Sequence, residues 1–236
     1  MSDATDRDTI DWDRFWAEAD ETERAGATAS AHHAHETLRA FLDARVPDLA
    51  SLADVGCGPG HVAFGVAERH PDAAVVGYDV AGSIVTENRE RARESDLGTL
   101  RFERTVLPEF DPDRTFDVVF CYATLSYVAD PERAIRTLHD AVEPGGYLVC
   151  SYPNTLAQVH YRRVAEAPEE HLPEDSGFDP DRYPDRFRLL IEGESLLSYD
   201  RIHDILETWP QSVWRVVEQP DGRYAWRHHP MVFVPK

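Results

Sequence analysis

The sequence predicts an α/β protein built on a doubly wound, mostly parallel seven-stranded sheet with an antiparallel hairpin at one edge. Three observations predict this class. Short apolar runs alternate with helical patterns between residues 51 and 153, a glycine-rich turn joins the first strand to its helix, and the chain ends in two successive strand-like runs. Parallel neighbours need crossover helices, whereas a hairpin gives an antiparallel pair.

Length and composition predict one domain over residues 1–236. The chain has 236 residues, of which 42% are hydrophobic, and this is enough for one sizeable core. No apolar run approaches the roughly 18 to 20 residues that span a bilayer, and the first residues, MSDATDRDTIDWDR, are acidic and polar rather than basic and then apolar like a signal peptide. We therefore expect a cytoplasmic protein with no membrane partner.

The charge is strongly acidic. Twenty-four basic residues face 44 acidic ones, the net charge is −20, and Lys236 is the only lysine. This balance is typical of a protein from a salt-loving cell, with ordinary acidic solubility as the alternative. It disfavours nucleic-acid partners, which need basic patches. The cysteines Cys57, Cys121 and Cys150 lack metal-type spacing, so we expect reduced thiols and no metal site.

Two helices are expected before the first strand, within an N-terminal region of residues 1–48. Trp12, Phe15 and Trp16 recur at helical spacing in residues 11–25, and a second helical pattern covers 32–46. Residues 51–55 then read as a short buried strand, and 61–70 as a helix. Strand, glycine turn and helix form the first unit of the sheet.

The same alternation continues along the chain. We expect strands at 73–80, 100–107, 116–125 and 147–153, and helices at 83–96 and 130–146. Asp130 is a suitable N-cap with Pro131 in the first helical position, and Ala141 and Val142 would end the apolar stripe. A helix follows Ser198, and 212–235 reads as two strands joined by the turn "QPDG".

Residues 154–190 separate the fifth strand from the last helix. They contain prolines 168, 173, 180 and 184 among many charges, with no strong core pattern. Long connections in compact domains are commonly functional. We therefore predict an irregular lid or acceptor-binding insertion, with disorder as the alternative.

The glycine turn reads Asp54-Val55-Gly56-Cys57-Gly58-Pro59-Gly60. A dinucleotide fingerprint has the pattern G-x-G-x-x-G, but here His61 stands where its third glycine belongs. There is also no Lys-Ser/Thr pair of the kind found in phosphate-binding loops. The spacing therefore disfavours a pyrophosphate ligand.

With its preceding acid, this turn resembles the first motif of class I S-adenosylmethionine-dependent methyltransferases of the small-molecule type. Asp79, which ends the strand "VVGYDV", and the stretch "FDVVFCYATLSYVADPERAIRTLHDAVEPGGYLVCSYPN" extend the resemblance over about residues 50–153. The resemblance implies a Rossmann-like fold, with the terminal hairpin as the family's reversed edge strand. It also implies S-adenosylmethionine as the methyl donor.

The resemblance assigns the donor site residue by residue. The three glycines allow unusual backbone angles and close approach, Asp54 or a loop carbonyl suits the donor's ammonium, and Asp79 suits the ribose hydroxyls. Helix N-capping is the plainer alternative for Asp79. The family often carries an acid after its third strand, and this chain does not. The predicted donor-binding residues are Asp54, Gly56, Cys57, Gly58, Gly60, Asp79, Val80, Thr105, Val106, Cys121 and Tyr122.

The acceptor side is less defined by the sequence. Methyl transfer from a sulfonium requires alignment, exclusion of water and at most one proton acceptor. Tyr122, Tyr127 and His33 are candidate catalytic residues, with packing or surface roles as the alternatives. The predicted function is methyl transfer to an O or N atom of a small-molecule acceptor. An NAD(P)-dependent oxidoreductase and a non-catalytic adenosylmethionine-binding protein are the alternatives, and no oligomeric state is predicted.

Overall fold

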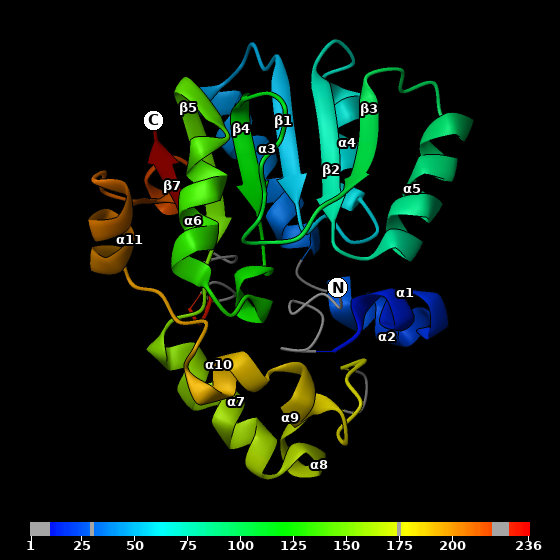
Figure 1. Cartoon of the computed structure of the whole chain (residues 1–236), viewed down its shortest axis with the longest axis vertical. Helices are drawn as coiled ribbons and strands as arrows, with labels where there is room; N and C mark the ends of the chain where they lie inside the picture. Colours follow the sequence, from blue (N-terminus) through cyan, green and yellow to red (C-terminus); the bar gives the residue numbers. More distant parts are fainter. Residues whose placement is uncertain (1–9, 29–30, 174–175, 219–226) are drawn as a thin grey trace.

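The computed structural model describes residues 10–28, 31–173, 176–218 and 227–236. Its centre is a seven-stranded sheet of order β3-β2-β1-β4-β5-β7-β6, in which β7 and β6 are antiparallel to their neighbours and the other pairings are parallel (Figure 1). The predicted fold class, a Rossmann-like α/β sheet with a reversed edge, is confirmed.

The strands are mostly short. They are β1 (Ser51–Val55), β2 (Ala74–Asp79), β3 (Leu100–Arg104), β4 (Phe116–Cys121), β5 (Val142–Ser151), β6 (Gln211–Ser212) and β7 (Met231–Pro235). In the register of β1 and β2, Asp54 lies opposite Gly77 and Val55 opposite Tyr78. The carboxyl ends of β1 and β2 therefore lie at the same edge of the sheet.

Helices cover both faces of the sheet. One core packs against α3 (Ala31–Arg45) and α4 (His61–Arg69), and the other against α6 (Pro131–Asp140) and α11 (Tyr199–Leu206). Alternate strand residues serve the two cores, as Leu52 and Ala53 of β1 illustrate. The helix α5 (Gly82–Glu94) packs beside β3.

The helix α6 begins as expected but ends early. The Asp130 carboxylate accepts a hydrogen bond from the Arg133 backbone N–H, and Pro131 occupies the first turn. The helix ends at Asp140, whereas Val142 belongs to β5 and pairs with Phe116. The prediction that Val142 continues the helical stripe was therefore wrong, because the apolar residue completes a strand ladder instead.

The expected irregular segment at 154–190 is largely helical. It contains α7 (Thr155–Glu166), α8 (Pro168–His171), α9 (Tyr183–Arg186) and α10 (Arg188–Glu192). Pro168 and Pro184 lie in the first turns of α8 and α9, where proline is tolerated, so they do not break helices here. Val164, Tyr183 and Phe187 bury a small core of their own. The prediction of irregular structure was wrong for these residues.

The predicted terminal hairpin is only half formed by strands. The strand β7 pairs antiparallel with β5, but β6 has two residues and is followed by a 3₁₀ turn, Val213–Arg215. The Ser212 side chain accepts a hydrogen bond from the Trp214 N–H, and Val213 is fully buried against the sheet. This local bond and the burial favour a turn over a longer strand. The turn "QPDG" lies outside the described residues.

Three helices, rather than two, precede β1 in the described chain: α1 (Trp12–Glu18), α2 (Glu21–Thr28) and α3. The Asp13 carboxylate accepts a hydrogen bond from the Ser83 N–H at 2.8 Å, and Arg24 donates two bonds to the Glu87 carboxylate. These bonds tie α1 and α2 to α5. Figure 1 shows the parallel strands pointing towards α1, α2 and the α7–α10 helices.

Within the described ranges, the helices are too short or too polar to cross a membrane.

Candidate functional site

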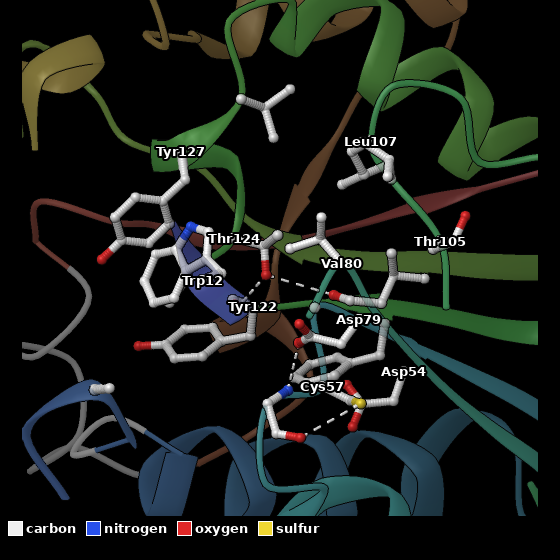
Figure 2. Close-up of a pocket in the computed structure, with 18 of the residues that line it drawn as sticks. Trp12, Asp54, Cys57, Asp79, Val80, Thr105, Leu107, Tyr122, Thr124 and Tyr127 are labelled. Carbon is white, nitrogen blue, oxygen red and sulfur yellow. Dashed lines mark hydrogen bonds between the residues drawn. The ribbon is translucent and has the colours of Figure 1, made fainter. Parts of the chain in front are cut away.

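A cavity of about 400 Å³ lies at the carboxyl ends of the parallel strands. This is within the usual size range of small-molecule sites, and parallel α/β sheets bind ligands at this edge. Figure 2 shows the acidic side chains Asp54 and Asp79 near Cys57. Tyr122 and Tyr127 belong to an aromatic side of the cavity, and Val80 belongs to an aliphatic side.

The glycine turn forms the floor of the cavity in an unusual backbone conformation. Gly56, Gly58 and Gly60 have φ angles of 77°, 48° and 75°. A Cβ at Gly56 would collide with the Thr124 side chain, and one at Gly60 would lie 3.0 Å from the Phe102 ring. Internal packing therefore requires glycine at these two positions, in addition to any close approach of a ligand to the turn.

The N–H groups of the turn are already engaged. Gly56 and Cys57 donate to the Tyr78 carbonyl, Gly58 donates to Asp79 Oδ2 at 2.8 Å, and Gly60 donates to the Cys57 carbonyl. The Gly58 carbonyl accepts a bond from the buried Asn88 amide at 2.7 Å. These four N–H groups therefore hold the turn itself in place.

Asp79 connects the turn to the end of β2. Its side chain is 7% exposed, and its Oδ1 accepts a hydrogen bond from the Ala81 N–H at 3.0 Å. Burial raises the pKa of Asp79, and the N–H groups of Ala81 and Gly58 partly oppose that rise. Each carboxylate oxygen keeps a lone pair for a hydroxyl donor in the cavity. The helix α5 has Ala81 rather than Asp79 at its N-cap position.

Asp54 is the second buried carboxyl group of the site. Burial is the main cause that raises its pKa to about 7, the Ala63 N–H lowers it, and the charge of Asp79 raises it. Its Oδ2 is buried and has no hydrogen-bond partner among the described residues. A buried acceptor without a donor is costly, so this atom suits a cationic donor from a ligand.

The aliphatic side of the cavity follows β2 and β3. Val80, Thr105, Val106 and Leu107 line it, and the Thr105 N–H donates to the Asp79 carbonyl at 2.9 Å. Arg104 Nε donates to the Val80 carbonyl at 2.8 Å, which fixes this end of the site. The surface suits a flat, weakly polar group such as a nucleobase.

The aromatic side comes from distant parts of the chain. The Trp12 ring lies edge-on to Tyr127 with centroids 4.8 Å apart, and Trp16 would be 3.3 Å from a Cβ at Gly58. Tyr122 follows β4, and Arg186 comes from α9. The ends of the strands thus form one part of the site, and the helices α1 and α9 cover it.

The structure brings most of the predicted site together. Ten predicted residues line the cavity: Asp54, Gly56, Cys57, Gly58, Asp79, Val80, Thr105, Val106, Tyr122 and Tyr127. Three do not. Gly60 is the N-cap of α4, Cys121 is fully buried in the core beneath α6, and His33 is exposed on α3. Because side chains alternate along a strand, Cys121 points away from the face that Tyr122 shares with the cavity.

Sequence reasoning missed Thr124 and Arg186 as lining residues. Thr124 donates to the Tyr122 carbonyl at 3.0 Å and occupies the space left by Gly56. Only the close packing of two loops reveals this, and the sequence contains no signal for it. The sequence does not single out Arg186 either, because its burial depends on how residues 154–190 fold over the site. Over the described chain, no group of three or more His, Cys, Asp or Glu residues could hold a metal ion.

Comparison with known proteins places the chain among methyltransferases in sequence. A family model described as "Methyltransferase domain" matches residues 48–186. The trans-aconitate 2-methyltransferase of Variovorax paradoxus is 34% identical over 128 residues, covering 52% of this chain and 48% of the relative. The chain spans about half the length of the curated relatives it matches.

Solved structures resemble the chain to different degrees. PKMT2 from Rickettsia typhi in complex with S-adenosylhomocysteine has a TM-score of 0.57 at 12% identity, covering 84% of this chain and 52% of that chain. CalS10, an amino pentose methyltransferase from Micromonospora echinaspora solved with S-adenosylmethionine, is 29% identical, with a TM-score of 0.45 and coverage of 53% and 52%. The first of these likenesses concerns the fold alone.

Proposed function

Because the chain belongs to the methyltransferase domain family, whose model matches more than half of it, we propose that it transfers a methyl group from S-adenosylmethionine to an oxygen or nitrogen atom of a small-molecule acceptor. The observation that carries the proposal is the partnerless buried oxygen of Asp54 beside Asp79, in a cavity floored by the glycine turn. The donor is cationic, and its positive charge would pair with these two buried carboxyl groups, which have no cationic partner among the described residues at the site.

The residues present fit that donor. Asp79 is placed to accept the ribose hydroxyls, Asp54 to accept the ammonium group, and Val80 with Thr105 and Val106 to contact the base. When bound, the donor supplies an electrophilic methyl group on sulfonium. The acid often found after the third strand in this family is absent here, so the adenine contacts of this chain come from Thr105, Val106 and the backbone.

The chain's own contribution is alignment and exclusion of water. Trp12 and Trp16 cover the turn, and Tyr122 and Tyr127 line the same side of the cavity. The aromatic faces favour a nearby sulfonium charge. We place the acceptor between these side chains and α9, and we infer that Tyr122 or Tyr127 contacts its nucleophilic atom. His33 is exposed on α3 and does not line the cavity, so we do not assign it that role.

The segment 154–190 is the proposed acceptor cover. Its helices reach the cavity through Arg186 and reach the N-terminal helices where Gly177 packs against Gly26. The names of the curated relatives support a small-molecule acceptor for this chain, because several are trans-aconitate 2-methyltransferases. The acidic chain with a single lysine further supports a cytoplasmic protein adapted to high salt, without nucleic-acid partners.

Calorimetry tests the donor. S-adenosylmethionine and S-adenosylhomocysteine are titrated into the protein at high salt, with NAD as the competing ligand. We expect both adenosyl ligands to bind and NAD to give no heat. Binding of NAD without any response to S-adenosylhomocysteine would support an oxidoreductase instead.

A labelled-methyl screen then tests turnover. The protein is incubated with methyl-labelled donor and fractionated small-molecule extract, and label transfer is measured with a heat-inactivated sample as control. Transfer to a low-molecular-weight fraction is the expected result. Donor binding without transfer to any fraction would favour a non-catalytic binding protein.

A further inference from the structure

Arg186 is a buried arginine on the acceptor side of the cavity. It ends α9, is 7% exposed and lines the space between the central cavity and a groove that α1 forms with residues 177–188. Its guanidinium carbon lies 4.9 to 5.5 Å from the ring centroids of four aromatic side chains: Trp12, Phe15, Phe178 and Phe187. The charge thus sits where the N-terminal helices meet the segment 154–190.

The guanidinium has no anionic partner in the described part of the chain. Its Nε is buried without a hydrogen bond, and no carboxylate there lies within ion-pair distance. Two arginines near the site are paired with carboxylates: Arg24 with Glu87, and Arg133 with Glu109. In a chain of net charge −20, a buried arginine without a carboxylate is therefore an exception that needs a physical reason.

Aromatic rings alone do not meet the needs of this group. Ring faces attract the cation, but they do not accept the in-plane N–H bonds of a guanidinium well. A buried charge that lacks its hydrogen-bond partners is strongly unfavourable. The forked donor geometry of arginine matches a carboxylate with two parallel bonds. A phosphate would bring a second negative charge into a cavity that already contains Asp54 and Asp79.

We propose that Arg186 binds a carboxylate group of a molecule held in the central cavity. This inference rests on the proposed function, because the carboxylate comes either from the amino-acid end of the donor or from an acceptor that is itself a carboxylic acid. In both cases Arg186 is a ligand-binding residue, and its aromatic surroundings position the fork and exclude water.

The test compares variants at position 186 with a control from the same helix region. Arg186→Gln removes the charge, Arg186→Lys keeps the charge without the fork, and Arg186→Met places an apolar chain among the rings. Arg182→Gln is the matched control, because Arg182 is an exposed arginine that pairs with Asp179 and does not line the central cavity. Thermal unfolding reports the fold of each variant. A methionine among aromatic rings packs well, so Arg186→Met should unfold no earlier than the wild type.

Two binding measurements distinguish the source of the carboxylate. The first compares S-adenosylhomocysteine with 5′-methylthioadenosine, which lacks the amino-acid end. If the carboxylate belongs to the donor, Arg186→Gln lowers the affinity for S-adenosylhomocysteine at least about tenfold and leaves the affinity for 5′-methylthioadenosine unchanged. The second titrates trans-aconitate, succinate and phenylacetate, with succinamide and phenylacetamide as neutral controls, into protein saturated with S-adenosylhomocysteine. If the carboxylate belongs to the acceptor, an acid binds and its amide does not, and Arg186→Gln abolishes the binding.

Arg186→Lys should show an intermediate loss in whichever measurement responds, and Arg182→Gln should show none. The inference is overturned if Arg186→Gln and Arg186→Met match the wild type in both measurements, if amides bind as well as acids, or if inorganic phosphate binds more tightly than the acids. Failure of the proposed function gives a different result. A wild type that binds no S-adenosylhomocysteine refutes the donor, while titration of the acids into donor-free protein still tests Arg186.

Discussion

The two sides of the cavity are built in different ways. The proposed donor side consists of residues at or just after the carboxyl ends of β1, β2 and β3, and hydrogen bonds of backbone N–H groups, such as Gly58 N–H to the Asp79 carboxylate, fix their positions. The cover side consists of side chains such as Trp12, Tyr127 and Arg186, which come from segments far apart in the chain. The first side is held by strand ends and the second by packed rings. We therefore expect variants of the two sides to separate donor binding from acceptor binding.

The largest effect is expected at Gly56, on which the donor side depends. Gly56→Ala combines a left-handed backbone angle with a collision with Thr124. We expect a loss of about 2 to 4 kcal/mol in the free energy of unfolding. Donor binding should be lost with it, because the turn must shift. Denaturant unfolding and calorimetry measure the two quantities.

Two other glycines are matched controls. Gly145→Ala has the strained angle, with φ of 91°, but no atom within 4 Å of the added Cβ, so only the strain of about 1 to 2 kcal/mol is expected. Gly98→Ala has neither strain nor collision and should stay within about 0.5 kcal/mol of the wild type. Equal losses for Gly56→Ala and Gly145→Ala would show that the collision with Thr124 adds no cost.

Asp79 gives the next largest effect on donor binding, and its removal also lowers stability because the buried Gly58 N–H loses its acceptor. Asp79→Ala should weaken the binding of S-adenosylhomocysteine by about 1 to 3 kcal/mol, because the ligand loses hydrogen bonds to a charged group. Tyr127→Phe on the cover side should leave that affinity unchanged, since its ring packing with Trp12 is retained. The two sides do not have separate roles if Tyr127→Phe lowers the donor affinity as much as Asp79→Ala does.

The same division explains what the sequence could predict. Each donor-side residue lies within a few positions of a strand end or glycine, and alternating strands and helices are visible in one dimension. The mostly parallel sheet with its antiparallel edge and the lining residues of the donor side were therefore predictable. Gly60 and Cys121 were placed at the site by their neighbours in sequence, but the start of α4 and strand alternation turn them away from it.

The cover side could not be predicted in the same way. The helices at 155–192 are mostly short, and their prolines look like helix breakers until their first-turn positions are known. What stabilises them is contact between rings distant in sequence, such as Tyr127 with Phe187 at 5.7 Å. Local patterns do not encode such contacts, so Arg186 and Thr124 could be assigned only from the structure.

We expect Asp54 to make donor binding depend on pH. Its pKa in the ligand-free fold is raised to about 7, and the donor's ammonium favours the ionised form. The affinity for S-adenosylhomocysteine should therefore fall about tenfold from pH 8 to pH 6. Asp54→Asn should bind more weakly at pH 8 and lose most of this dependence. A wild-type profile that stays flat over this range would contradict the role of Asp54.

Stability of the ligand-free protein should change in the opposite direction. A carboxyl group whose pKa is raised on folding contributes stability that is complete below its unfolded value of 3.8 and is lost as pH rises to about 7. Relative to Asp54→Asn, the wild type should become less stable between pH 4 and pH 7. Taking the difference between the two proteins cancels the buried histidines, whose lowered pKa values act with the opposite sign.

The smallest effect separates two cysteines that the sequence placed at the same site. Cys57 lines the cavity, whereas Cys121 is fully buried against Cys150 on the α6 side of the sheet. Cys121→Ala should cost about 1 kcal/mol of stability, because it removes one buried atom, and leave the affinity for S-adenosylhomocysteine unchanged. Cys57→Ala should instead weaken that affinity, by about fourfold if one apolar contact is lost. Calorimetry on both variants measures this difference. The contrary result would be a Cys121→Ala variant that binds the donor more weakly but is as stable as the wild type. Strand alternation at the end of β4 would then not decide which side chains reach the donor.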